Sequence, residues 1–274
     1  MKLRKIFRKY PIPCCVAAAL SVFLLLGAVS LIHRVLPDGI PSGLARQVLN
    51  ILWPLLLTLL LGYGWCYRKG HFGKTLLAGL FALILFSSTF LIRFGEAVMN
   101  DETSWKAASG ICIGVLNILG IGFREETIFR GVIANDLSIA YGKTPRGVWK
   151  AVILSGLIFG LVHLTNIISG VNPLRAVIQV VSACSLGMYY TAIYFRGGNL
   201  WALVLIHCLT DAGGLFRSAF TTAATAAGVL NDISITGMIM IPVYIGITIF
   251  ILRRSKMDAV IENLKQAETA DRIE

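Results

Sequence analysis

The sequence predicts an all-α polytopic integral membrane protein of about eight transmembrane helices that enclose an intramembrane polar site. Two observations support this fold class. Of the 274 residues, 56% are hydrophobic and only 14% are charged, against about 25% charged residues in an average soluble domain. The mean hydropathy is +0.76, and apolar runs of about 20 residues, the length that crosses a bilayer, recur along the chain.

The apolar runs give eight candidate spans. They lie at roughly 12–33, 46–67, 74–94, 106–140, 148–168, 174–195, 199–217 and 233–252. The first run follows a basic head but is longer than the roughly 7–15 apolar residues of a cleavable signal sequence, so we expect a retained helix. The fourth run is too long and too polar for a simple span. The spans divide the chain into three N-terminal helices (1–105), a core with the polar motifs (106–252) and a charged tail (253–274).

The basic residues predict the orientation of the chain. Lys and Arg are concentrated before the first span, in alternate connections and after the last span, which is the pattern of cytoplasmic segments. We therefore expect a multi-pass protein of the cell membrane with both termini in the cytoplasm. The net charge of +11 is then explained by topology and by contacts with anionic lipid head groups, so we expect membrane lipid rather than nucleic acid as a partner.

The tail carries its own pattern. Met257, Val260, Ile261 and Leu264 recur at i, i+3, i+4 and i+7, which predicts a short amphipathic helix on the membrane surface. The alternative is a partly frayed, solvated tail.

Ionisable residues inside apolar spans are costly, so they are usually paired or functional. In the fourth span, Glu126 and Arg130 are four residues apart and predict an ion pair on one helix face. Glu125 points about 100° away and is left without a partner by this arrangement, which suits a general base. The alternative is a surface charge cluster at a helix end.

Two later spans carry histidines. His163 ends the apolar helix that includes Phe159, and His207 and Asp211 are four residues apart on the seventh span. These side chains have ordinary alternatives, namely a packed histidine and a local His–Asp hydrogen bond. However, Glu125, His163 and His207 all lie about 14–24 Å from the cytoplasmic ends of their helices at 1.5 Å per residue. We therefore expect them to meet at a common depth.

The three motifs together resemble the CPBP intramembrane protease family, which includes CAAX prenyl proteases and bacteriocin-processing or immunity proteins. The family pattern of EExxxR, FxxxH and HxxxN or HxxxD is matched by three segments over roughly residues 115–215: Glu125-Glu126-x-x-x-Arg130, Phe159-x-x-x-His163 and His207-x-x-x-Asp211.

The resemblance implies an endopeptidase that cleaves a membrane-anchored protein or peptide. It assigns water activation to Glu125 and His163, stabilisation of the oxyanion to His207 and Asp211, and structural support to Glu126 with Arg130. The CAAX branch typically has Asn where this chain has Asp211, and a carboxylate suits a metal better than an oxyanion. A divalent metal such as zinc, bound by His163, His207 and Asp211, is therefore kept as an alternative to a metal-free mechanism.

Two other functions stay open at this point. A non-proteolytic immunity or scaffolding protein of the same fold would use the polar cluster to bind a partner helix. A proton-coupled transporter would use it as a proton relay, although the chain shows no internal repeat of the kind common in transporters.

Overall fold

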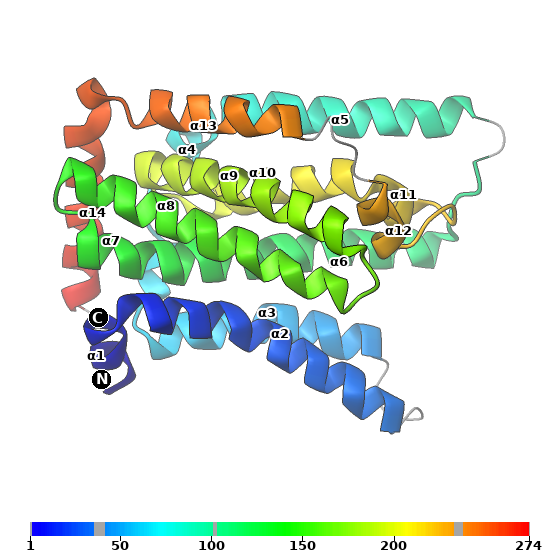
Figure 1. Cartoon of the computed structure of the whole chain (residues 1–274), viewed down its shortest axis with the longest axis horizontal. Helices are drawn as coiled ribbons and strands as arrows, with labels where there is room; N and C mark the ends of the chain where they lie inside the picture. The colour runs from blue at the N-terminus through cyan, green and yellow to red at the C-terminus, as the bar shows by residue number, and fades with distance from the viewer. Residues whose placement is uncertain (1, 36–41, 101–102, 233–237, 274) are drawn as a thin grey trace.

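The computed structural model describes residues 2–35, 42–100, 103–232 and 238–273, and these residues form helices and connections without a strand. The prediction of an all-α fold is confirmed. Most helices run along the long axis of the molecule, whereas α14 lies across one end of the bundle, where it packs against α7, α8 and α9 (Figure 1). The elements are α1 (Lys2–Lys9), α2 (Pro11–Val35), α3 (Ser42–Leu60), η1 (Gly64–Tyr67), α4 (Phe72–Ala78), α5 (Leu80–Met99), α6 (Ala108–Glu126), η2 (Thr127–Ala134), α7 (Asn135–Tyr141), α8 (Pro145–Leu161), η3 (Val162–Ile167), α9 (Pro173–Gly197), α10 (Leu200–Gly214), α11 (Phe216–Phe220), α12 (Ala226–Asn231), α13 (Met240–Ile251) and α14 (Arg254–Ile273).

Each predicted span contains one apolar helix. Among the described residues, five helices are long and apolar enough to cross a membrane: Pro11–Val29, Leu80–Met99, Ala108–Tyr141, Pro145–Ile167 and Pro173–Gly197. The other three apolar helices are shorter, at Ala45–Leu60, Leu200–Gly214 and Met240–Ile251. The start of the last predicted span, 233–237, lies outside the described residues.

The long fourth span is one continuous helical segment whose winding changes. It begins as α6, widens into the π-helical η2 and continues as α7. Every residue of η2 is buried, so this stretch occupies the centre of the bundle. Wide turns of this kind are frequent at functional sites, and Glu126 is the last residue before the widening.

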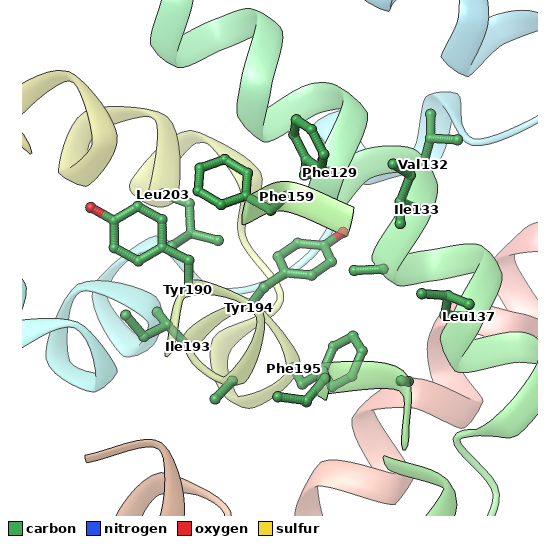
Figure 2. Packing of buried hydrophobic residues seen from close by; sticks show 14 of the residues in the cluster. Phe129, Val132, Ile133, Leu137, Phe159, Tyr190, Ile193, Tyr194, Phe195 and Leu203 are labelled. Atoms are coloured by element: carbon green, nitrogen blue, oxygen red, sulfur yellow. The ribbon is translucent and has the colours of Figure 1, made fainter. Parts of the chain in front are cut away.

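The core is built around η2, α8, α9 and α10. Figure 2 shows aromatic and aliphatic side chains from these elements and from α7 in mutual contact. The labelled residues are Phe129, Val132, Ile133, Leu137, Phe159, Tyr190, Ile193, Tyr194, Phe195 and Leu203. Small residues let the backbones of α8 and α9 approach closely: a Cβ atom at Gly156 would lie 2.8 Å from the Cys184 carbonyl oxygen, and one at Gly187 would lie 3.1 Å from Gly156 Cα. Close approach through glycine is typical of helix pairs in membranes.

The C-terminal tail is a helix that packs on protein. Met257, Val260 and Leu264 are 4%, 0% and 8% exposed and join the same core as the transmembrane helices. The Asn263 amide donates to the carbonyl oxygen of Arg196 at the end of α9 (3.0 Å). The predicted amphipathic helix is confirmed in place of the frayed tail, and its apolar face lies against the bundle. Its position at the membrane surface stays a prediction.

The Gly156 contact predicts a sensitive position. In Gly156→Val, the added side chain has no room against the α9 backbone, and overpacking of this kind costs about 1–3 kcal/mol. We expect a lower unfolding temperature in detergent for this variant. Gly246→Val on α13 is the matched control, because a Cβ atom there meets nothing within 4 Å. Equal losses in the two variants would contradict the proposed close packing of α8 and α9.

Candidate active site

The buried pair of Glu126 and Arg130 forms the base of the site. Arg130 Nη1 donates to Glu126 Oε1 at 2.9 Å, and both side chains are 0% exposed. The guanidinium group also donates to the Gly187 carbonyl oxygen (3.2 Å) and lies over the rings of Phe159 and Tyr190, 4.7 and 5.3 Å from their centroids. The ion pair predicted from the i, i+4 spacing is confirmed, and the charge of Arg130 is compensated by a carboxylate and two aromatic faces.

Glu126 also holds His207 in place. His207 Nδ1 lies 2.6 Å from the same Glu126 Oε1 atom, so the ring donates a hydrogen bond to the carboxylate through Nδ1. A hydrogen bond at one ring nitrogen fixes the orientation of a histidine and the role left to the other nitrogen. Nε2 therefore faces Glu125 Oε2 at 3.6 Å and Asp211 Oδ2 at 3.8 Å.

Glu125 has a partner that the sequence did not predict. Arg124 Nη2 donates to Glu125 Oε1 at 2.8 Å, and Arg124 Nη1 donates to Asn50 Oδ1 on α3 at 2.8 Å. The expectation of an unpaired Glu125 was wrong because the long Arg124 side chain bends round the helix toward its neighbour. Oε1 is thus fixed, while Oε2 remains on the side of His207.

His163 lies across the cavity on η3. Its Nδ1 is 2.9 Å from the Phe159 carbonyl oxygen, which fixes the ring one turn beyond Phe159. The Phe159 ring packs edge-on against both His163 and His207, with centroids 5.1 and 6.1 Å apart. Phe159 is therefore the common packing surface for Arg130 and for both histidines.

The predicted residues converge on one cavity of about 670 Å³. Glu125, His163, His207 and Asp211 all line it, together with Arg124, so the expected meeting of the three motifs is confirmed. The cavity extends to α11 and α12, at the end of the bundle opposite both termini (Figure 1). Asp211 Oδ2 is buried in it without a hydrogen-bond partner among the described residues.

A catalytic zinc site typically has three protein ligands around one open position. In the described part of the chain, no group of three or more His, Cys, Asp or Glu side chains is placed to hold a metal ion. His207 already uses Nδ1 on Glu126, which leaves only Nε2 for coordination. A bond from the other ring nitrogen to a carboxylate is also typical of metal-bound histidines, so the metal set His163, His207 and Asp211 stays a prediction.

Arg124 and Asn50 are the polar residues that sequence reasoning missed. Both are buried, at 8% and 5% exposure. Asn50 could have been identified from the sequence as part of a polar contact, because an amide inside the otherwise apolar second span needs a hydrogen-bond partner. Nothing in the sequence, however, indicated that this partner is Arg124.

Residues 107–213 match one family model, described as type II CAAX prenyl endopeptidase Rce1-like. This segment is CAAX protease-like. The match confirms the resemblance to the CPBP family, and the CAAX protease-like segment contains all three motifs. No curated protein and no solved structure matches the chain.

The central ion pair predicts a large loss of stability when one partner is removed. Arg130→Gln leaves the Glu126 carboxylate buried without its counter-ion, which typically costs about 3–5 kcal/mol. The double variant Glu126→Gln with Arg130→Gln is expected to recover part of this loss, measured as the unfolding free energy in detergent. Arg93→Gln is the control, because Arg93 and Glu96 are 52% and 58% exposed and such pairs contribute about 0–1 kcal/mol. If the loss in the double variant equals the sum of the losses in Glu126→Gln alone and Arg130→Gln alone, the two residues do not interact directly.

Proposed function

We propose that the protein is an intramembrane endopeptidase that hydrolyses a peptide bond of a membrane-anchored protein or peptide. One observation carries the proposal: four ionisable side chains from α6, η3 and α10 line a single cavity among the membrane-spanning helices. The similarity of residues 107–213 to a family of CAAX prenyl endopeptidases supports the same activity.

In the proposed mechanism, Glu125 and His163 activate the attacking water. Glu125 Oε1 is held by Arg124, so Oε2 is the atom that accepts the proton of the water. Its 3.6 Å separation from His207 Nε2 is too long for a direct hydrogen bond, but a water oxygen to one side of the two atoms can be within hydrogen-bond distance of both. His163 faces the same cavity and assists as a second proton acceptor or donor.

His207 is the proposed oxyanion donor. Attack on the peptide carbonyl places negative charge on its oxygen, and a preoriented donor lowers the energy of that state. The bond from Nδ1 to Glu126 aims Nε2 into the cavity, where it donates when it carries a proton. Three carboxylates, Glu125, Glu126 and Asp211, surround His207, and two guanidinium groups, Arg124 and Arg130, pair with the glutamates. A proton on Nε2 therefore balances the charge of the cluster.

Asp211 takes part beside His207. Its Oδ2 lies 3.8 Å from Nε2 and is buried. When protonated, the carboxyl group is a second donor to the oxyanion, as an asparagine amide would be. When ionised, it stabilises the protonated His207 ring through charge. Both roles require the short distance between residues 207 and 211, which the helical i, i+4 spacing provides.

The cavity also suggests the side from which the substrate enters. Its outer residues, Arg217 and Asp232, have side chains 52% and 69% exposed and belong to the end of the bundle away from both termini (Figure 1). With the termini in the cytoplasm, as the basic residues predict, this end faces the other side of the membrane. We propose that the scissile bond enters from that side.

Loss of the general base tests the reaction. Glu125→Gln and His163→Ala are expected to lower cleavage of membrane-anchored peptides by about 100- to 10,000-fold, the usual contribution of acid–base catalysis. The purified protein would be incubated with a peptide library and the products measured by mass spectrometry. Glu262→Gln on the exposed face of α14 is the matched control and should cleave at the wild-type rate.

The same assay separates the alternatives. Cleavage that persists after treatment with a chelator supports the glutamate-activated water, whereas loss that is restored by zinc supports a metal held by His163, His207 and Asp211. The peptide library must be one that a known CAAX protease cleaves. If wild type and Glu125→Gln then give the same products, the proposal is wrong and a binding or immunity role replaces it.

Cysteine labelling tests the direction of entry. Val229→Cys on α12, which lines the cavity, is expected to react with a membrane-impermeant maleimide only in right-side-out vesicles. Lys265→Cys on α14 should react only in inside-out vesicles, and the wild-type chain measures the background of native cysteines. The reverse pattern would place the mouth of the cavity on the cytoplasmic side.

A further inference from the structure

A second and larger cavity lies at the opposite end of the bundle from α11 and α12. It measures about 1020 Å³ and is bounded by η1, α4, the end of α9, α13 and α14. Among the residues that the structure describes, five lysines and arginines line it and no Asp or Glu does so: Lys69, Lys74, Arg196, Arg253 and Lys256. We refer to it below as the basic cavity.

Among the described residues, no acidic side chain pairs with the cations of the basic cavity. None of the five residues forms an ion pair with a residue that the structure describes. Lys69 Nζ donates to the Asn263 carbonyl oxygen at 3.1 Å, and Arg253 Nη1 donates to the Phe250 carbonyl oxygen at 2.7 Å. Burial lowers the pKa of Lys69 to about 8, which is the effect expected for an ammonium group without a counter-ion.

Two hydrogen bonds to backbone carbonyl oxygens of α9 hold the walls of the basic cavity together. The His71 amide donates to the Gly197 carbonyl oxygen (3.1 Å), which joins the start of α4 to the end of α9. Asn263 joins α14 to the same end of α9 through its bond to Arg196 (3.0 Å). The basic residues are therefore brought together by three segments that are far apart in the sequence, and hydrogen bonds join these segments.

One wall of the basic cavity is apolar and exposed on the outside of the bundle. Leu77 on α4 and Phe250 on α13 line it and are 72% and 63% exposed. Phe81 and Ile247 continue the same wall further along α5 and α13. A ligand that fills the cavity thus meets cations at the end near α14 and hydrocarbon-compatible side chains toward the membrane.

We propose that the basic cavity binds the phosphate-bearing head group of an anionic phospholipid, with an acyl chain along the apolar wall. Basic pockets between transmembrane helices are suited to such head groups. The volume is at the upper end of the roughly 300–1,000 Å³ of ligand pockets, which is far more than one inorganic phosphate occupies. A soluble phosphate ester shares the charge chemistry but leaves the apolar wall without a contact. The inference does not depend on the proteolytic activity.

Lipid binding would be measured by native mass spectrometry of the full chain in a neutral detergent. Phosphatidylglycerol and phosphatidylcholine with identical chains are the probes, and one bound phosphatidylglycerol per chain is expected at concentrations where phosphatidylcholine does not bind. The variant Lys74→Gln with Lys256→Gln removes two of the cations and should weaken this binding roughly thirtyfold. Lys74→Arg with Lys256→Arg keeps the charge and should bind within about threefold of wild type.

A matched control carries the same loss of charge elsewhere. Arg146→Gln with Lys265→Gln alters two exposed basic residues that do not line the cavity, and it should retain the wild-type affinity. An equal loss in the control, or equal binding of the two lipids, would overturn the proposal. Melting curves in lipid-free detergent check that each variant is folded. Glycerol 1-phosphate tests whether the ligand is a soluble phosphate ester. If it binds as tightly as phosphatidylglycerol, the lipid assignment is wrong.

Discussion

The buried ion pair between Glu126 and Arg130 is the interaction on which the site depends. Two charges at 0% exposure are costly among membrane helices unless each has further partners. Arg130 finds them in the Gly187 carbonyl oxygen and in the rings of Phe159 and Tyr190. Glu126 finds one in His207. The pair therefore joins α6, η2, α8, α9 and α10, and all of these elements except η2 contribute residues that line the active-site cavity.

In this arrangement, the residues that support the site are different from those that face the substrate. Glu126 and Arg130 are completely enclosed, whereas Glu125, one residue earlier, faces the cavity beside His163, His207 and Asp211. Two adjacent glutamates can serve different purposes because successive residues on a helix point about 100° apart. One carboxylate is directed at the packed centre of the bundle and the other at the space that a substrate can enter.

The two ends of the molecule carry different kinds of cavity. The active-site cavity reaches α11 and α12, and its charged groups are mostly paired with one another. The basic cavity lies near α14, and none of the described residues that line it is an Asp or a Glu. This asymmetry follows the distribution of Lys and Arg along the chain, since the segments that bear most of the basic residues converge on one end (Figure 1).

The sequence by itself determined the helical membrane fold, the Glu126–Arg130 pair and the common depth of Glu125, His163 and His207. These features follow from composition and from helical spacing, which are local properties of the chain. Only the tertiary structure decided that Arg124 pairs with Glu125 and reaches Asn50, that Glu126 orients His207 across 81 residues, and that α14 packs on the bundle. Such contacts join helices that are distant in sequence, and helix periodicity fixes which face a residue occupies but not which neighbour that face meets.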